Sequence, residues 1–209
     1  MKLYAVADIH GAQHRLNLIV DNMKKYNPNL VVICGDITQF GPGDQATLFL
    51  NQLPGEVYAV PGNIDTTDVY QGITNSKATN LHQQRVTKHH LPFVGIGGDL
   101  DAALPELPVA VEGKHVPFID VVTPESIIVS HVPPFGLQDK VFIGRHIGSK
   151  ELREIIDEKH PRLVLCGHVH EDPGVTYHNK TVVVNCSMGK RTEGAVITIN
   201  NKISVDILQ

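Results

Sequence analysis

The sequence predicts an α/β fold in which two β-sheets pack face to face and helices cover their outer sides. Short, nearly continuous runs of Val, Ile and Leu recur along the chain and end in Gly, Pro or polar residues, as strands buried on both faces do. Amphipathic helical segments lie between these runs in the first part of the chain. The last part carries short strands joined by turn residues, which is typical of antiparallel hairpins.

The first part of the chain supplies the buried strands and the helices. Helices are predicted over residues 14–26 and 45–52, where apolar side chains fall on one face, and over residues 149–159, where Ser149 is a candidate N-cap. The predicted strands are the apolar runs 2–7, 30–34, 57–60, 93–96, 126–129 and 162–166.

The C-terminal part changes in character. Strands are predicted at 175–178, 181–184, 195–199 and 203–208, with turns at 178–180 and 200–201. Residues 99–125 contain four prolines and little periodicity, which indicates a long loop or a small insertion over the sheet edge. We therefore expect a single domain over residues 1–209 that carries this proline-rich segment at 99–125.

Composition excludes several classes of protein. Hydrophobic residues make up 42% of the 209 residues and charged residues 19%, so intrinsic disorder, collagen and coiled coil do not fit. A formal net charge of −4 argues against a dedicated binder of duplex nucleic acid. No signal peptide or membrane span can be drawn, and three scattered cysteines form neither a disulfide framework nor a CxxC zinc site, so we expect a cytoplasmic protein that binds no membrane.

Residues able to bind a metal follow five of the predicted strands. Taken singly, each has an ordinary structural explanation, such as a helix cap, a turn or a satisfied polar side chain. Because ligands bind beyond the carboxyl ends of strands in α/β sheets, we expect all of them to meet at one rim. They are Asp8 and His10 after the first strand, Asp36 after the second, Asn63 after the third, His131 after the fifth, and His168 and His170 after the sixth.

The donor set indicates what kind of metal centre this would be. Nitrogen and oxygen donors without a thiolate suit manganese first, with iron, zinc, nickel or cobalt as alternatives. Seven ligands are too many for one tetrahedral zinc ion. They fit two divalent ions bridged by a carboxylate and a hydroxide, an arrangement that stabilises the attacking and leaving oxygens of phosphoryl displacement.

In this order the motifs resemble the calcineurin-like metallophosphoesterase superfamily, over residues 8–170. The resemblance implies a two-sheet α/β/β/α sandwich, with the C-terminal hairpins similar to its second sheet, and a hydrolysis in which a metal-bridging hydroxide attacks phosphorus. It also implies a ligand assignment: Asp8, His10 and His170 for the first ion, Asn63, His131 and His168 for the second, and Asp36 between them. The motifs that carry it are Asp8-x-His10, Gly35-Asp36, Gly62-Asn63-x-Asp65, His131 and Gly167-His168-x-His170.

Within that superfamily the chain is similar to small prokaryotic members of the phosphodiesterase type. The Asp36 block lacks the Arg that follows it in serine/threonine phosphatases and diadenosine tetraphosphate hydrolases, and the Tyr ligand of purple acid phosphatases is missing. The chain departs from the pattern at Ile64, where many active members carry a His that protonates the leaving oxygen. Loss of a general acid costs about 10²- to 10⁴-fold in rate.

Further residues are candidates for the site, and each of them also has an ordinary structural explanation. Asp65 is expected to orient a metal-ligating imidazole or to cap a helix that begins near Thr66. His146, or else His14, is a candidate to replace the missing acid, against a plain surface role. Arg145 is a candidate contact for phosphate oxygens, and Gly11, like Asn63, is expected to border the substrate. As alternatives, Arg145 is a solvated loop residue and Gly11 a turn glycine.

The function expected from these residues is that of a binuclear metal-dependent phosphoesterase, in particular a phosphodiesterase, with a small phosphate ester or diester as substrate. The alternative is a catalytically weak scaffold or regulatory module of the same fold, suggested by Ile64. The complete ligand set favours the enzyme. A nuclease acting on single strands is disfavoured by the acidic charge and the few aromatic residues, and a homo-oligomer is left open.

Overall fold

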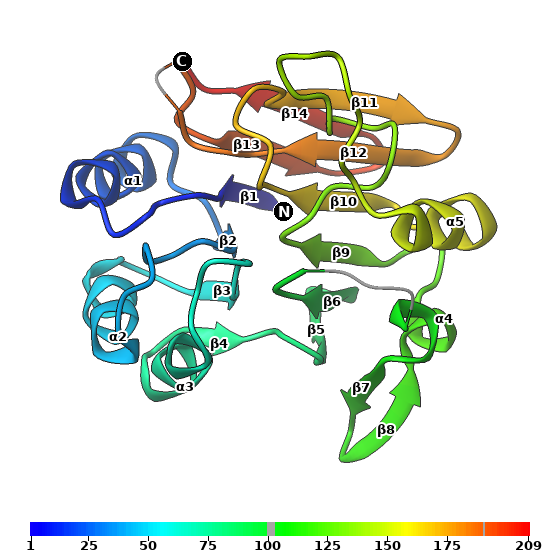
Figure 1. The fold of residues 1–209 in the computed structure, drawn as a ribbon, viewed down its shortest axis with the longest axis horizontal. Coiled ribbons are helices and arrows are strands. Elements are labelled where there is room, and N and C mark those ends of the chain that lie inside the picture. The colour runs from blue at the N-terminus through cyan, green and yellow to red at the C-terminus, as the bar shows by residue number, and fades with distance from the viewer. Residues whose placement is uncertain (100–102, 190) are drawn as a thin grey trace.

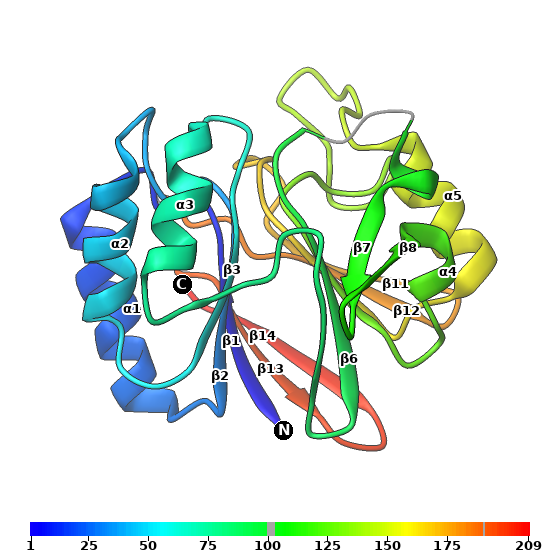
Figure 2. The same cartoon turned by 90° about the horizontal axis from the view of Figure 1, so that it is seen from below.

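The computed structural model describes residues 1–99, 103–189 and 191–209 and has four layers (Figure 1). Two six-stranded sheets lie face to face, and helices cover the outer side of each, as Figure 2 shows. This confirms the predicted fold class, including the α/β/β/α order that the family resemblance implied.

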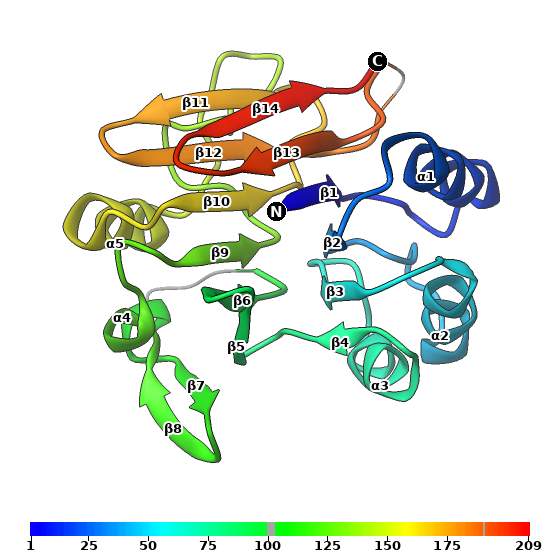
Figure 3. The ribbon, with the colours of Figure 1, turned by 180° about the vertical axis from the view of Figure 1, so that it is seen from behind.

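The first sheet combines both ends of the chain. Its strands run in the order β14-β13-β1-β2-β3-β4, and its four strands from the first part of the chain are parallel. The β13–β14 hairpin joins β1 antiparallel, with Leu3 opposite Ile197 (Figure 3). The strands are β1 (Lys2–Val6), β2 (Leu30–Cys34), β3 (Val57–Val60), β4 (Thr79–Asn80), β13 (Ala195–Ile199) and β14 (Ile203–Ile207).

The second sheet has the order β11-β12-β10-β9-β6-β5. Here the expectation from the resemblance needs correction, because only the β11–β12 hairpin belongs to this sheet. The other C-terminal hairpin extends the first sheet, where β13 pairs with β1. The strands are β5 (Arg85–Lys88), β6 (Leu91–Ile96), β9 (Ile127–Ser130), β10 (Leu163–Cys166), β11 (Gly174–His178) and β12 (Thr181–Asn185).

Three helices cover the first sheet: α1 (Gln13–Tyr26), α2 (Gly43–Gln52) and α3 (Thr67–Asn75). The second sheet is covered by the short α4 (Phe118–Val121) and by α5 (Lys150–Lys159). The Ser149 hydroxyl caps α5 by accepting a hydrogen bond of 3.0 Å from the backbone N–H of Leu152, as the sequence predicted.

The layers enclose three apolar cores. The core between the sheets takes alternate residues of the strands, such as Leu3, Val32, Phe93 and Leu165, which are fully buried. A second core lies between the first sheet and α1–α3, and a third between the second sheet and α4 and α5. Apolar side chains on both faces of each sheet explain why the buried strands read as continuous hydrophobic runs rather than as alternating ones.

The proline-rich segment contains more regular structure than its sequence suggested. It forms a short 3₁₀ turn (Leu104–Glu106) and a hairpin of β7 (Pro108–Val111) and β8 (Lys114–Pro117), followed by α4. The Ala110 N–H donates to the Gln83 carbonyl beside the edge strand β5, so the hairpin lies at that edge of the second sheet. Residues 100–102 of the predicted insertion lie outside the described residues. None of the helices in the described ranges has the length and apolarity needed to cross a lipid bilayer.

Candidate metal centre

The structure brings the seven expected metal ligands together on loops that follow five strands. Three of these strands, β1, β2 and β3, belong to the first sheet, and β9 and β10 belong to the second. The loops are tied to each other across the sheets: the ring Nδ1 of His131 lies 2.8 Å from the carbonyl oxygen of Cys34, and the His168 N–H donates to Asp8 Oδ2. The centre therefore sits where the carboxyl ends of the two sheets meet.

One group of donors consists of Asp8, His10 and His170, whose ligand atoms all lie within 4.8 Å of one another. The Nε2 atoms of His10 and His170 face each other at 3.2 Å, and His170 Nε2 lies 3.3 Å from Asp8 Oδ1. These are the three residues that the resemblance assigned to the first ion.

A second group lies beside it. The side-chain oxygen of Asn63 is 2.8 Å from His131 Nε2 and 3.2 Å from His168 Nδ1. The Asp36 carboxylate lies between the groups, with one oxygen 3.4 Å from His131 Nε2 and the other 4.0 Å from His10 Nδ1.

The donor atoms fit divalent ions, because several of their lone pairs point at one another with no proton between them to form a hydrogen bond. The Cys34 carbonyl can only accept, so the neutral form of the His131 ring would carry its proton on Nδ1 and turn the Nε2 lone pair toward the oxygens of Asn63 and Asp36. Within the described ranges, the buried atoms Asp8 Oδ1 and His10 Nδ1 make no hydrogen bond of normal geometry. A cation placed among such lone pairs would remove the cost of burying them unpaired.

Charge and burial shift the pKa values of these groups. Burial raises the pKa of Asp36 to about 6, although the nearby His131 opposes this effect. Burial also acts to raise the pKa of Asp8, but the close approach of His170 and the electrostatic effect of nearby His131 outweigh it, so that this pKa is lowered. Burial lowers the pKa of His10 and of His168, which favours the neutral imidazoles that a metal requires.

Unusual backbone conformations hold the ligands in place. Asp8, His10, Asp36 and His168 all have a left-handed backbone, with φ between 51° and 69°. Such a conformation is uncommon outside glycine and concentrates at functional sites. These four expected ligands are thus held at sharp turns directly after their strands.

Two glycines make room for the ligand side chains. A Cβ on Gly62 would lie 1.9 Å from Asp36 Oδ1, and a Cβ on Gly35, where φ is +89°, would lie 2.4 Å from His131 Nδ1. Only glycine can therefore precede the ligands Asp36 and Asn63 at these positions.

Asp65 has a different role from the one predicted. Its carboxylate accepts hydrogen bonds of 2.8–3.0 Å from the backbone N–H groups of Ile37, Thr38 and Gly62 and from the Thr38 hydroxyl. Among the described residues it neither hydrogen-bonds an imidazole nor caps α3, whose first turn has no side-chain cap. Asp65 instead joins the loop that carries Asp36 to the loop that carries Asn63.

We expect Asp65→Ala to destabilise the fold on the order of 3 kcal/mol, because three backbone donors and a hydroxyl lose a charged acceptor. Metal affinity should fall about 10- to 100-fold, as it does when groups that orient ligands are removed. Urea unfolding and metal titration measure the two effects, with Asp68→Ala on the exposed face of α3 as the control. A variant as stable as the control would show that the two loops do not depend on Asp65.

Three other predicted residues are engaged outside the ligand group. The Gly11 N–H donates to the Ile37 carbonyl, and a Cβ there would meet Gln45, so its turn conformation alone accounts for the glycine. Arg145 is exposed, and its carbonyl accepts a bond from the Val141 N–H. His146 Nδ1 lies 2.5 Å from an oxygen of Asp139, and its ring centroid lies 5.7 Å from that of Phe135 at an interplanar angle of 57°; these contacts involve none of the seven ligands.

Sequence reasoning missed two residues that shape the site. The Arg15 guanidinium donates to the carbonyl of Asp8 and so places a positive charge beside the first donor group. Its position in the first turn of α1, directly after the Asp8-x-His10 loop, is a signal that could have identified it. The fully buried Asp139 carboxylate accepts hydrogen bonds from the N–H groups of Gly136 and Gly148 and from His146. The local sequence contains no signal from which these bonds could have been predicted.

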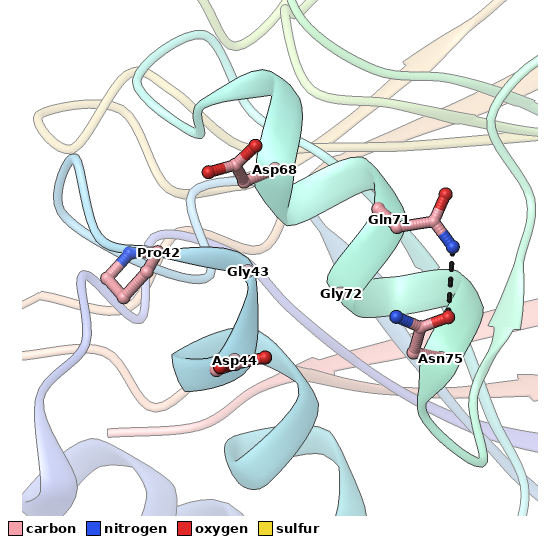
Figure 4. Close-up of a pocket in the computed structure, with 7 residues that line it drawn as sticks. All are labelled: Pro42, Gly43, Asp44, Asp68, Gln71, Gly72 and Asn75. Atoms are coloured by element: carbon pink, nitrogen blue, oxygen red, sulfur yellow. Dashed lines mark hydrogen bonds between the residues drawn. The ribbon is translucent and has the colours of Figure 1, made fainter.

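Two cavities include expected ligands in their linings. One of about 660 Å³ includes His170, Arg15 and Phe142 in its lining, and the other, of about 320 Å³, includes His168 and residues 147–151. A further hollow of about 240 Å³ lies between α2 and α3 (Figure 4). Its lining includes Asp44 and Asp68 but none of the expected ligands, so it is separate from the metal centre.

Comparison with known proteins gives consistent results. Residues 1–172 match the family model described as calcineurin-like phosphoesterase. An uncharacterised protein of Methanocaldococcus jannaschii, MJ1162, is 34% identical over 197 residues, which cover 90% of this chain and 88% of that protein. A probable glycerophosphodiester phosphodiesterase, GpdQ, of Arcobacter nitrofigilis is 25% identical over 88% of this chain and 71% of its own length. The crystal structure of TT1561 of Thermus thermophilus has a TM-score of 0.70 and 16% identity, covers 100% of this chain and 99% of its own, and shares the fold.

Proposed function

The chain belongs to the calcineurin-like phosphoesterase family, and on this premise we propose that it is a binuclear metal-dependent phosphodiesterase. The observation that carries the proposal is the convergence of seven nitrogen and oxygen donors from five strand ends on one centre. A scaffold protein has no need of such a complete set.

We assign Asp8, His10 and His170 to one ion and Asn63, His131 and His168 to the other, with Asp36 shared. Divalent ions held there supply Lewis-acid stabilisation of phosphoryl oxygens and an acidified water. The chain contributes fixed positions: the Cys34 carbonyl orients the His131 ring, and the bonds of Asp65 hold the Asp36 and Asn63 loops at one separation. Such preorganisation lowers the cost of reaching the transition state.

The two cavities support a diester rather than a monoester substrate. A phosphodiester has two organic arms, and separate cavities at His170 and at His168 offer a space for each arm. The relative from Arcobacter carries the name of a phosphodiesterase, which agrees with this proposal.

Metal analysis and a paired activity assay test the function. Protein purified without chelator should contain about two ions per chain. With added manganese it should hydrolyse bis-p-nitrophenyl phosphate faster than p-nitrophenyl phosphate, and a chelator should remove the activity. Nitrogen and oxygen donors fit manganese, and zinc, iron, nickel and cobalt are compared in the same assay.

Ile64 supports a second candidate, a binding module of the same fold with little catalysis. In this position the side chain offers no proton to a leaving oxygen. Two bound ions without turnover over long incubation would favour this candidate over the enzyme. Metal-free protein that regains neither ions nor activity on adding manganese would contradict both.

We propose His146 as the group that protonates the leaving oxygen. Asp139 is fully buried and holds His146 Nδ1, and among the described residues His146 Nε2 has no hydrogen-bond partner. The same loop lines both cavities through Phe142 and residues 147–149. His146→Gln should therefore slow alkyl phosphodiesters about 10²- to 10⁴-fold and p-nitrophenyl esters much less. Asp139→Asn should steepen the dependence on the leaving group in the same direction. Equal losses on both ester types would show a structural role only.

The three cysteines are free and buried, which fits a reducing compartment, and we propose that the protein acts in the cytoplasm.

A further inference from the structure

The cavity beside His170 is large enough for a complete organic group. Its volume of about 660 Å³ lies within the range of small-molecule sites, which is about 300–1,000 Å³. Because His170 is an expected metal ligand, the cavity adjoins the position where the phosphorus of a substrate would bind. The residues that give the cavity its chemistry are Arg15, Phe142, Glu171, Arg191 and Thr192.

Phe142 gives this cavity an aromatic wall. The side chain is 90% exposed. It lies on the loop between β9 and α5, between the two glycines Gly136 and Gly148, and the loop is anchored by Asp139 rather than by Phe142 itself. An exposed ring on an anchored loop beside a cavity is a surface on which a planar group can stack.

Positive charge surrounds the same cavity. Arg15 and Arg191 both line it, and within residues 1–99, 103–189 and 191–209 no carboxylate lies within 4.0 Å of either guanidinium. Among the described residues of the lining, Glu171 is the one acidic residue, beside the two arginines. Guanidinium groups with spare N–H donors bind phosphate and stack on planar rings.

We propose that this cavity binds an aromatic, hydrogen-bonding arm of the diester, the nucleoside part of a nucleotide, and so sets the substrate class of the proposed phosphodiesterase. A small alkyl arm such as glycerol would leave most of the volume empty and would present no face to Phe142. The inference rests on the proposed function, since the arm is defined by its attachment to the phosphorus that is hydrolysed.

Two chromogenic diesters with the same leaving group test the proposal. Thymidine 5′-(p-nitrophenyl phosphate) carries a nucleoside arm, whereas methyl p-nitrophenyl phosphate carries a methyl arm. The ratio of kcat/KM for the first to that for the second should be well above one in the manganese-loaded protein. It should fall about 10- to 100-fold in Phe142→Ala, the usual effect of losing a stacking side chain, and also in Arg191→Gln. Tyr177→Ala, which removes an exposed aromatic from β11, should keep the wild-type ratio.

Equilibrium binding separates this proposal from the proposed function. Thymidine 5′-monophosphate should bind more tightly than inorganic phosphate, and Phe142→Ala should weaken the nucleotide but not the phosphate. If neither diester is hydrolysed but this pattern holds, the nucleotide site stands and the phosphodiesterase fails. A ratio near one in the wild type, or one that Phe142→Ala leaves unchanged, overturns the nucleotide site. A change of oligomeric state in Phe142→Ala, seen by light scattering, also overturns it, because the ring would then be covered by a second copy.

Discussion

Asp36→Asn should abolish both turnover and the binding of the metal pair. Its two oxygens face His131 of one donor group and His10 of the other, so the loss of its charge affects both groups at once. Removing a residue that only orients a ligand costs about 10- to 100-fold in metal affinity or activity, and the loss of a shared ligand should exceed this. Elemental analysis and the bis-p-nitrophenyl phosphate assay measure the two effects.

The metal-free form of this variant is expected to behave differently. Burial raises the pKa of Asp36 to about 6, so the charged carboxylate is held in the fold at a cost that a neutral amide avoids. Metal-free Asp36→Asn should therefore be at least as stable as the metal-free wild type, while the stabilisation gained on adding manganese is lost. Asp68→Asn, at the separate hollow of Figure 4, is the matched control. A variant with two bound ions and the wild-type rate would contradict the shared position of Asp36.

Much of the fold could be predicted because the buried strands are short apolar runs with clear stops. Runs such as Leu30–Cys34 and Val57–Val60 coincide with strands, and the predicted helices agree with α1, α2 and α5 within a few residues. The sheet assignment of the β13–β14 hairpin could not be predicted, since it depends on which strand edge remains free after the chain has folded. The same applies to the hairpin in the proline-rich segment, whose partner is the distant edge at Gln83.

The candidate site could also be predicted only in part. Each ligand follows a strand directly, so chain order and topology alone bring the set together. The role of Asp65 could not be read from the sequence, because its partners are backbone N–H groups, which look the same in every sequence. The roles of Asp139 and Arg15 were not predicted for a related reason: their hydrogen-bond partners lie in turns whose shape is set by the fold.

Ile64→His should raise the rate on alkyl phosphodiesters, up to the 10²- to 10⁴-fold that a general acid contributes, and should change aryl diesters little. Ile64 is half-buried in the loop between Asn63 and Asp65, and its backbone N–H donates to Asp36. A histidine side chain, which is similar in size, would therefore lie beside the ligands at this position. Alkoxide leaving groups need a proton, whereas p-nitrophenolate leaves without one.

Ile64→Gln, which is polar but cannot supply a proton near neutral pH, is the control, and metal content should stay the same in both variants. An equal gain with His and Gln, or an equal effect on alkyl and aryl esters, would mean that proton donation does not limit the rate. A selective gain with His would show that the metal centre is competent and that an acid at residue 64 protonates natural leaving groups more effectively than His146 does.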